Sequence, residues 1–263
     1  MEAFLRFMTS PWGIVIFTVV ALAVIIFFLA VNYRFFTKAV LDFIFGLIAL
    51  ILISPCIAVC AVILKKKAGK VFEEQYIIGK NGKFIPVRVF ASYTAADGRE
   101  CYISRSALRY IPLVLEVICG KLSLIGPAPL SLTDGSLIDD EYEMRFTVRP
   151  GIFSAAVLSF PRRPQYEDMF ASDCDYAAKR SLFTDFKAFI VNVLRIMRGE
   201  EQGYLTVGRS GYADELLSDG AITQEQYEEA KKLAEEELEA SRRAKFRVCL
   251  LYTSDAADDL IGV

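Results

Sequence analysis

The sequence contains no histidine and only one tryptophan among its 263 residues. The absence of imidazole excludes Ser-His-Asp triads, Cys-His dyads, His-ligated zinc and a histidine general base. The six cysteines include no Cys-x-x-Cys pair, which excludes zinc ribbons and thioredoxin-like redox sites. A net charge of −2 lacks the basic excess of a nucleic-acid-binding protein. Any chemistry must therefore use carboxylates, Lys, Arg, Tyr, Ser or Cys.

Hydrophobic residues make up 54% of the chain, above the ~45–50% of an average soluble domain, which indicates membrane segments. Residues 14–31 form an uncharged apolar stretch of eighteen residues, about long enough to cross a ~30 Å hydrocarbon core as a helix. Trp12 and Tyr33 lie at its ends, where interfacial aromatic anchors are typical. No small-residue cleavage site follows, so a cleaved signal peptide is disfavoured. The sequence predicts a retained transmembrane helix within residues 1–32.

A second apolar stretch, residues 43–64, contains Ser54-Pro55 and lies within a predicted membrane helix over residues 38–67. Proline removes a helical hydrogen bond and clashes with the preceding turn, at a cost of ~3 kcal/mol, and it disfavours helical geometry at Ser54. In lipid the freed carbonyl groups need partners. Two outcomes fit this pattern: a kinked helix that spans the bilayer, or a helix-break-helix that enters one leaflet and returns.

Basic residues flank this segment on both sides, because Arg34 and Lys38 precede it and Lys65–Lys67 follow it. Positive charges are enriched on the cytoplasmic side of membrane segments. The pattern therefore favours the re-entrant form, in which both ends of the segment lie at the cytoplasmic face.

The remaining chain, residues 69–248, is soluble in character. Residues 71–90 contain two short β-type runs around an Asn81-Gly82 turn signal, which predicts a β-hairpin. Residues 120–130 form a turn-rich loop, and residues 185–198 predict an amphipathic helix. We expect a membrane-associated α/β (α+β) fold that combines an N-terminal transmembrane helix, a re-entrant helix-break-helix and a small helix-rich domain with a β-hairpin.

A C-terminal helical hairpin is predicted over residues 213–248. After a short first helix, Thr223 and Gln226 form a capping box for a charged helix that continues to about Lys245. The unit resembles the short helical modules appended to many bacterial membrane proteins. Two helices alone bury little surface. The hairpin therefore packs on this chain's own domain, lies in solvent, or docks on another protein or another copy.

The last fifteen residues, 249–263, have no periodicity and resemble the translated adapter of a transposase sequencing library. We interpret them as a sequencing artefact and exclude them from the reasoning about the fold. The natural chain is expected to continue past Val248.

Four motifs follow one another between residues 33 and 199. They are Lys38-x3-Asp42 followed by Ser54-Pro55, then Phe72-x2-Gln75-x3-Gly79-x2-Gly82-x-Phe84, then GKLSLIGPAPL at residues 120–130, and then Arg145-x2-Val148-Arg149-Pro150-Gly151-Ile152. In this order and spacing they resemble the bacterial sugar transferases, monotopic membrane enzymes that pass a sugar-1-phosphate from a nucleotide sugar to a polyprenyl phosphate. The resemblance implies the re-entrant helix and a location in the bacterial cytoplasmic membrane, with the main domain facing the cytoplasm.

The residues that carry the chemistry of this family are replaced. The family's Asp-Glu pair, which supplies the nucleophile and a Mg²⁺-coordinating carboxylate, aligns with Arg109 and Tyr110. A guanidinium cannot be deprotonated in a protein, and neither side chain suits Mg²⁺, which takes oxygen ligands such as carboxylates. Further departures are Ile77, Ala128, Arg88-Val89-Phe90-Ala91 and Phe160-Pro161 in place of the family's Arg, Arg, Lys-Phe-Arg-Thr and Gly-Arg. No catalytic residue is intact, and no metal or other cofactor is expected, although active family members use Mg²⁺.

Arg88, Arg145 and Arg149 remain as candidate phosphate-binding residues, because the arginine fork suits phosphate oxygens. The alternative is that these arginines form structural ion pairs or lie along the membrane headgroups. Glu116 and the acidic run at residues 139–141 offer no convincing replacement for the lost carboxylates.

Three functions are compatible with this pattern. The first is a non-catalytic scaffold or regulatory homologue in capsule or exopolysaccharide biosynthesis, with the lipid bilayer and an active sugar transferase or another glycan-assembly protein as partners. The second is an active phosphoglycosyl transferase with a rebuilt site. The third is a membrane-docked interaction module outside this pathway. Arg109 and Tyr110 favour the first.

Overall fold

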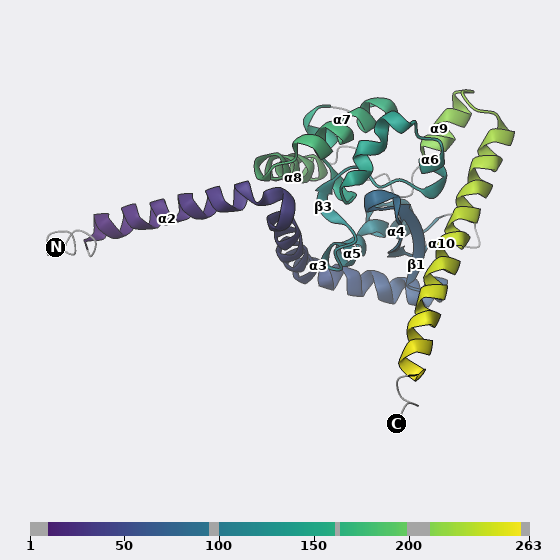
Figure 1. The fold of residues 1–263 in the computed structure, drawn as a ribbon, viewed down its shortest axis with the longest axis horizontal. Coiled ribbons are helices and arrows are strands. Elements are labelled where there is room, and N and C mark those ends of the chain that lie inside the picture. The colour runs from purple at the N-terminus through teal and green to yellow at the C-terminus, as the bar shows by residue number, and fades with distance from the viewer. Residues whose placement is uncertain (1–9, 95–99, 161–163, 199–210, 259–263) are drawn as a thin grey trace.

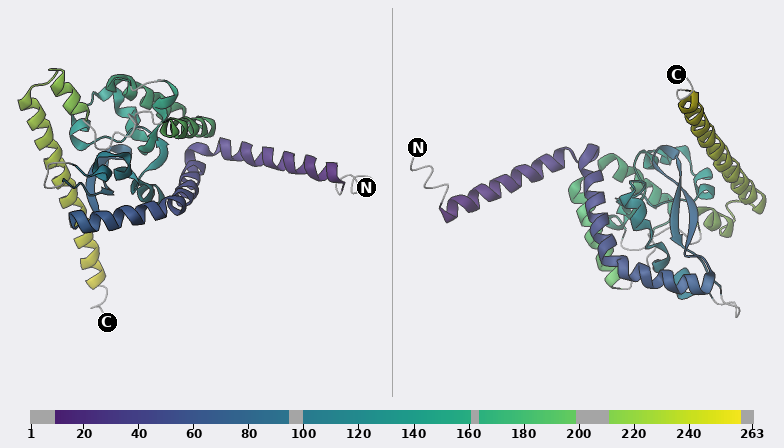
Figure 2. Two further views of the ribbon diagram at one scale, coloured as in Figure 1. Left: turned by 180° about the vertical axis from the view of Figure 1, so that it is seen from behind. Right: turned by 90° about the horizontal axis from the view of Figure 1, so that it is seen from below.

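The computed structural model describes residues 10–94, 100–160, 164–198 and 211–258. The predictions that fall on Pro161 and on residues 1–9 and 259–263 lie outside this part of the chain. A long N-terminal helix, α2, projects from a bent helix, α3, and the helix-rich domain lies inside the angle between the two halves of α3 (Figure 1). Figure 2 shows the same arrangement from behind and from below.

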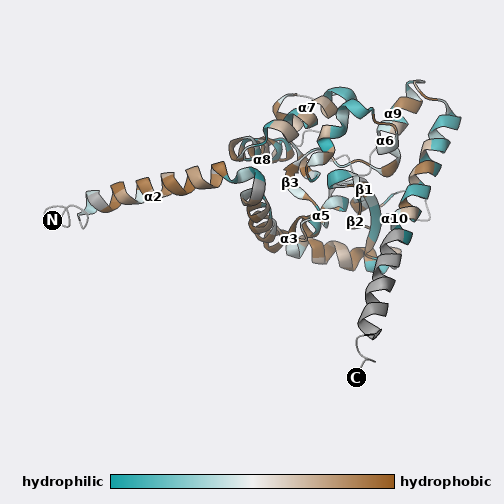
Figure 3. Ribbon diagram, in the orientation of Figure 1, coloured by the Kyte–Doolittle hydropathy of each residue, from teal (hydrophilic) through white to brown (hydrophobic). Residues whose placement is uncertain are grey.

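Two apolar helices form the N-terminal part: α2 (Pro11–Val31) and α3 (Lys38–Ala68), joined through a short π-helix, η1 (Tyr33–Thr37). Figure 3 shows that hydrophobic residues dominate both helices, and many of their large apolar side chains are exposed. By length and composition α3 is able to cross a membrane, whereas the apolar part of α2, Ile14–Leu29, is shorter. A membrane crossing by α2 therefore stays a prediction.

The helix α3 continues through Ser54-Pro55 instead of breaking there. Because Pro55 has no amide hydrogen, it leaves the carbonyl oxygen of Ile51 without its helical partner. The Ser54 hydroxyl donates to this same oxygen at 2.8 Å, as Ser and Thr side chains do beside prolines in membrane helices. The helix bends near its middle (Figures 1 and 2), and an internal proline is the usual cause of such a bend. The expected helix-break-helix is therefore a continuous, kinked helix.

The predicted β-hairpin is confirmed by two antiparallel strands, β1 (Phe72–Ile78) and β2 (Phe84–Phe90). The turn between them contains a short 3₁₀ segment, η2 (Lys80–Gly82). Asn81 and Gly82 have φ angles of 58° and 69°. Asparagine and glycine tolerate this left-handed conformation better than other residues do, so the Asn-Gly signal identifies the turn correctly.

A second, parallel strand pair joins two segments that the sequence did not predict as strands. β3 (Ser123–Gly126) lies inside the turn-rich loop and pairs with β4 (Gly151–Ser154). The two backbones approach closely, because a Cβ on Gly151 would lie 2.1 Å from the amide nitrogen of Gly126. Any side chain at position 151 would therefore push the two strands apart.

Short helices connect the strands, and two longer helices pack over them. In chain order they are α4 (Tyr102–Arg105), η3 (Ala107–Tyr110), α5 (Leu113–Ile118), α6 (Leu132–Ser136), η4 (Asp140–Thr147), η5 (Ala155–Leu158), α7 (Tyr166–Lys179) and α8 (Leu182–Met197). The amphipathic helix expected at residues 185–198 is α8. It begins earlier than expected because Ser181 caps it, accepting a hydrogen bond from the Thr184 amide at 3.2 Å.

The helix α8 leaves one apolar face uncovered. Phe183, Phe186 and Met197 are 72%, 65% and 78% exposed, and Ile190 and Leu194 lie between them at the spacing of a single helix face. Exposed apolar surface of this kind marks contact with a membrane or another molecule. Because α8 lies beside the start of α3 (Figure 1), its face extends the apolar surface of α3.

A polar network fastens the start of α3 to the domain. Asp42 accepts hydrogen bonds from the Ser123 hydroxyl at 2.7 Å and from the Leu124 amide at 3.1 Å, both in β3. Lys38, one helical turn before Asp42, forms an ion pair with Asp185 of α8. The Lys38-x3-Asp42 motif therefore joins α3 to β3 and α8.

The C-terminal hairpin consists of α9 (Tyr212–Ser218) and α10 (Gln224–Asp258). Its capping box is confirmed, because the Thr223 amide donates to Oε1 of Gln226 at 2.8 Å and the Gln226 amide donates to Oγ1 of Thr223 at 3.3 Å. The helix α10 runs beyond the expected end near Lys245.

This hairpin packs on the chain's own domain. The ring centre of Tyr212 lies 5.4 Å from that of Tyr166 and 5.1 Å from that of Phe170, both in α7. Ala230 and Ala234 of α10 are buried as well. Among the alternatives for the hairpin, these contacts support the one in which it completes its own core.

An ion pair is buried within the main hydrophobic core. Nη2 of Arg145 lies 2.8 Å from Oδ2 of Asp173, and neither side chain is more than 1% exposed. The guanidinium carbon also lies 4.6 Å from the ring centre of Phe170. Burial raises the pKa of Asp173 to about 6, against the opposing effect of the Arg145 charge. The two groups depend on each other, since removal of either would leave a buried group without its counter-charge.

Replacing Arg145 with Met should destabilise the fold by about 3–5 kcal/mol, because the buried Asp173 would lose its ion pair with Arg145. The unfolding midpoint of the full chain in detergent micelles, followed by circular dichroism, should fall by several degrees. The double variant Arg145→Met/Asp173→Leu should recover most of the loss. Lys179→Met, which removes the exposed pair with Asp175, is the control and should leave the midpoint unchanged. A wild-type midpoint for Arg145→Met would contradict the prediction.

Candidate functional site

Arg109, on η3, faces the β-hairpin. Its Nη2 lies 3.6 Å from Oε2 of Glu73 on β1, and its side chain is 15% exposed. The same Glu73 oxygen accepts hydrogen bonds from the Ser92 amide at 3.3 Å and the Ser92 hydroxyl at 3.2 Å. Burial raises the pKa of Glu73, but the Ser92 hydrogen bonds and the charges of Lys70 and Arg109 outweigh it, so the pKa lies below its usual range. Arg109 thus contacts a carboxylate that remains ionised at neutral pH.

Tyr110 lies at the edge of a hydrophobic cluster. It is partly buried against residues of the hairpin and α5, among them Val87, Val89 and Leu113. Mg²⁺ prefers several carboxylate, phosphate or water oxygens in an octahedral arrangement. Arg109 and Tyr110 do not fit this ion, because one side chain is a cation and the other packs against apolar groups. Within the described ranges no group of three His, Cys, Asp or Glu side chains could hold a metal ion.

Glu116, on α5, lies between two cations and is fully buried. Its Oε1 lies 2.6 Å from Nε of Arg88, and its Oε2 lies 2.7 Å from Nζ of Lys121. Burial raises the pKa of Glu116, but the hydrogen bonds and charges of Lys121 and Arg88 outweigh this effect and lower the pKa. The hydrogen bond to Glu116 in turn raises the pKa of Arg88. The sequence did not indicate this role for Glu116, because the contact joins α5 to β2.

Three cations gather at the turn that follows α5. Arg149 donates from Nη1 to the carbonyl oxygen of Gly120 at 3.2 Å. Lys121 lies in this turn, and Arg88 is held near it because both cations pair with Glu116. The side chains of Arg88 and Lys121 are 43% and 34% exposed. We call Arg88, Lys121 and Arg149 the turn cations. Glu116 pairs with Arg88 and Lys121, whereas Arg149 binds a carbonyl oxygen, so the three positive charges exceed the one carboxylate that contacts them. The turn therefore retains a positive charge that an anion can meet. Lys121 was not predicted as a phosphate-binding residue from the sequence.

Arg145 is separate from the turn cations. Besides its bond to Asp173, it donates to the carbonyl oxygen of Ala128 at 2.8 Å. Its Nε and Nη1 have no hydrogen-bond partner among the described residues, and the residue lines a cavity of about 10 Å³. A space of this size holds about one water molecule and is too small for a phosphate. The geometry therefore supports the structural alternative for Arg145.

Three of the other positions predicted to depart from the family pattern are buried. Ile77, Phe90 and Ala128 are 2%, 0% and 2% exposed. The backbone amide of Ala128 donates to Asp173 at 3.1 Å, next to Arg145. These three side chains thus contribute apolar packing where the resemblance would place a charged residue. This result connects the replaced residues to the core rather than to a ligand.

Glu116→Gln should destabilise the protein at neutral pH by about 3 kcal/mol, the low end of the range for breaking a buried pair, because its two partners are partly exposed. The folded-state pKa lies below the unfolded one, so the stabilising charge is fully present above pH ~4.3 and is lost as the pH falls through the folded value. The difference in unfolding midpoint between wild type and variant should therefore be constant from pH 7 to 5 and shrink below pH ~4. Glu143→Gln, on an exposed residue, is the matched control. A difference that persists unchanged at low pH would show that charge is not its cause.

Comparison with known proteins identifies relatives of this chain. The family model described as bacterial sugar transferase matches residues 33–199, more than half of the chain. The sugar transferase EpsL of Bacillus subtilis (strain 168) is 27% identical over 182 residues, which cover 61% of this chain and 89% of that protein. The UDP-glucose:undecaprenyl-phosphate glucose-1-phosphate transferase of Xanthomonas campestris pv. campestris is 28% identical over 199 residues, which cover 66% of this chain and 41% of that protein.

A second UDP-glucose:undecaprenyl-phosphate glucose-1-phosphate transferase, from Escherichia coli (strain K12), is 24% identical over 179 residues, which cover 59% of this chain and 39% of that protein. The aligned part thus spans about two fifths of the two glucose-1-phosphate transferases. The matched range begins at η1 and includes α3, both strand pairs, the turn cations and α8, whereas α9 and α10 lie outside it. This chain therefore belongs to the bacterial sugar transferase family.

Proposed function

We propose that this protein is a non-catalytic member of its family, a membrane-anchored scaffold or regulatory partner in the assembly of a surface polysaccharide such as a capsule or exopolysaccharide. The proposal rests on the sequence motifs, which align the family's Asp-Glu pair with Arg109 and Tyr110, and one observation supports it: the Arg109 guanidinium pairs with Glu73, and Tyr110 packs against the core. An arginine stays protonated in a protein and cannot attack phosphorus. Loss of a nucleophile typically lowers the rate by several orders of magnitude. The partner in this role is an active sugar transferase or another glycan-assembly protein.

The turn cations suit a protein that binds a phosphate-containing substrate without converting it. The turn cations present two guanidinium groups and an ammonium group, and guanidinium groups match the geometry of phosphate oxygens. These cations would hold a phosphate of a nucleotide sugar or of a lipid carrier. The protein would then position or sequester a substrate for a partner.

The proposed location is the bacterial cytoplasmic membrane, with the main domain facing the cytoplasm. α3 is long, apolar and mostly exposed, and it is kinked at Pro55 rather than straight. The exposed apolar face of α8 lies beside it. In the proposed arrangement α2 crosses the bilayer, and α3 enters the cytoplasmic leaflet and returns, which keeps the cations at both of its ends in water.

An active transferase with a rebuilt site is the second candidate, and Glu73 favours it. This residue places an ionised carboxylate 3.6 Å from Arg109, and carboxylates serve as nucleophiles in other enzymes that form covalent intermediates. The hydrogen bonds from Ser92 and the charge of Arg109 occupy that carboxylate, however, and this weakens it as a nucleophile. The non-catalytic function therefore stays the first choice.

The purified full chain, given UDP-glucose, undecaprenyl phosphate and Mg²⁺, should release no UMP above background, because no carboxylate occupies the nucleophile position. The relative from Xanthomonas campestris, assayed in parallel, is the positive control. Glu73→Gln and its neighbour Glu74→Gln should both match the wild-type background. Turnover that Glu73→Gln alone abolishes would assign the chemistry to Glu73 and overturn the proposal. Turnover that survives both substitutions would also overturn it and would place the nucleophile elsewhere.

The membrane arrangement predicts which positions an impermeant maleimide reaches in intact cells. Ser10→Cys should be labelled from outside, because α2 crosses the bilayer. Arg34→Cys and Lys70→Cys, at the two ends of α3, should be labelled only after permeabilisation. The exposed native Cys119 serves as an internal marker for the side on which the domain lies. Labelling of positions 34 and 70 from opposite faces would mean that α3 spans the bilayer, and protection of position 10 in intact cells would mean that α2 does not.

A further inference from the structure

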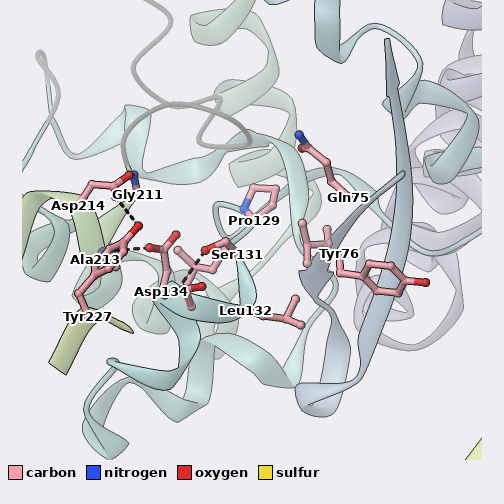
Figure 4. A pocket seen from close by; sticks show the side chains of 13 residues that line it. Gln75, Tyr76, Pro129, Ser131, Leu132, Asp134, Gly211, Ala213, Asp214 and Tyr227 are labelled. Carbon is pink, nitrogen blue, oxygen red and sulfur yellow. Dashed lines mark hydrogen bonds between the residues drawn. The ribbon is translucent and has the colours of Figure 1, made fainter. Parts of the chain in front are cut away.

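A cavity of about 410 Å³ lies between the domain that the family model matches, residues 33–199, and the C-terminal hairpin (Figure 4). The strand β1 contributes Gln75 on one side, the segment at residues 129–134 forms the middle, and Gly211, Asp214 and Tyr227 of the hairpin region lie on the other side. Ligand pockets for small molecules commonly measure about 300–1,000 Å³, so the cavity is large enough for one. One of its walls comes from outside the matched range at residues 33–199, so the matched domain alone does not form the cavity.

Specific contacts hold the hairpin in the position that closes the cavity. The Ala213 amide donates to Oδ1 of Asp134 at 3.0 Å, and the Ser131 hydroxyl accepts from the Asp134 amide at 3.1 Å. A Cβ on Gly211 would lie 2.4 Å from Oδ1 of Asp134, so a side chain at position 211 would displace the Asp134 carboxylate. On the outer side, the Arg242 guanidinium carbon lies 4.7 Å from the ring centre of Tyr76. These contacts therefore fix the position of the hairpin wall of the cavity.

The carboxylates in the cavity are already occupied by the protein. Asp134 accepts from Ala213, and Asp214 accepts from the Gly211 amide and from the Tyr227 hydroxyl, both at 2.9 Å. By contrast, the Gln75 amide and the Thr133 hydroxyl make no hydrogen bond with another described side chain or backbone group. Gln75 and Thr133 are therefore uncharged groups with free hydrogen-bonding capacity, and each can both donate and accept.

None of the thirteen residues that line the cavity, all of them described, is Lys or Arg. Two carboxylates without a cation repel a phosphate or a nucleotide, which excludes the anions that the turn cations would attract. The half-buried Tyr76 and Leu132 supply apolar surface beside the polar groups. A ligand that presents several hydroxyl groups around a ring with apolar C–H faces matches both parts of the lining.

We propose that this cavity is a binding site for an uncharged sugar, in which Gln75 and Thr133 bind the ligand hydroxyls and the C-terminal hairpin forms the closing wall. The site goes beyond the proposed function, because it requires neither transfer chemistry nor the turn cations. It also assigns the C-terminal hairpin a role in forming this site.

Saturation-transfer NMR on the full chain in micelles tests the site, with methyl glucoside, inorganic phosphate and spermidine as separate probes. Methyl glucoside should give a saturable signal, and phosphate should not reduce it. Gln75→Leu and Thr133→Val should each weaken binding of methyl glucoside at least about tenfold, the effect of losing ~1.4 kcal/mol of hydrogen bonding. Gln224→Leu, a glutamine substitution on α10 away from the cavity, should bind as the wild type does. Unfolding midpoints for all variants establish that the fold is intact.

The outcomes separate the alternatives. No methyl glucoside signal with the folded wild type, or a signal that Gln75→Leu and Thr133→Val leave unchanged, would overturn the sugar site. Binding of spermidine alone would also overturn it, because the carboxylates would then select a cation. Each result is independent of the UMP-release assay, so failure of the sugar site and failure of the non-catalytic function remain distinguishable.

Discussion

The attachment of α3 to the domain is the constraint on which the other features depend. Apolar contacts alone would not fix the orientation of an apolar helix against a polar domain, because lipid offers its side chains an equally favourable environment. Asp42 and Lys38 fix that orientation, because they direct hydrogen bonds and an ion pair to β3 and to Asp185 on α8. The kink at Pro55 then carries the second half of the helix beneath the domain (Figure 1). Through this attachment the apolar face of α8 lies beside the start of α3.

The positions at which the sequence predicts departures from the family pattern have one physical property in common, because each side chain is satisfied within the protein. Arg109 forms an ion pair with Glu73. Ile77 and Ala128 are buried among apolar side chains. A buried charge without a partner would be costly, so a paired or an apolar side chain is stable at such positions. These contacts agree with the proposed binding or scaffold role.

The C-terminal hairpin changes how the whole domain is understood. A two-helix unit gains stability mainly from what it packs against, and here Tyr212 inserts between aromatic side chains of α7. The hairpin thereby belongs to the same core as the buried Arg145–Asp173 pair. Its second consequence is the cavity next to Gln75, which exists only because the hairpin closes one side. The hairpin therefore contributes both to the stability of the core and to the formation of the cavity.

Local features were readable from the sequence by itself. The Asn81-Gly82 turn, the capping box at Thr223 and Gln226, and the perturbation of α3 at Pro55 each depend on residues within a few positions of one another. The parallel pairing of β3 with β4, the contact of Glu73 with Arg109 and the burial of Arg145 depend on segments far apart in the chain. Short-range rules of hydrogen bonding and φ preference determine the first group. The second group follows from packing, in which a distant side chain decides whether a charge meets solvent, a ligand or a partner.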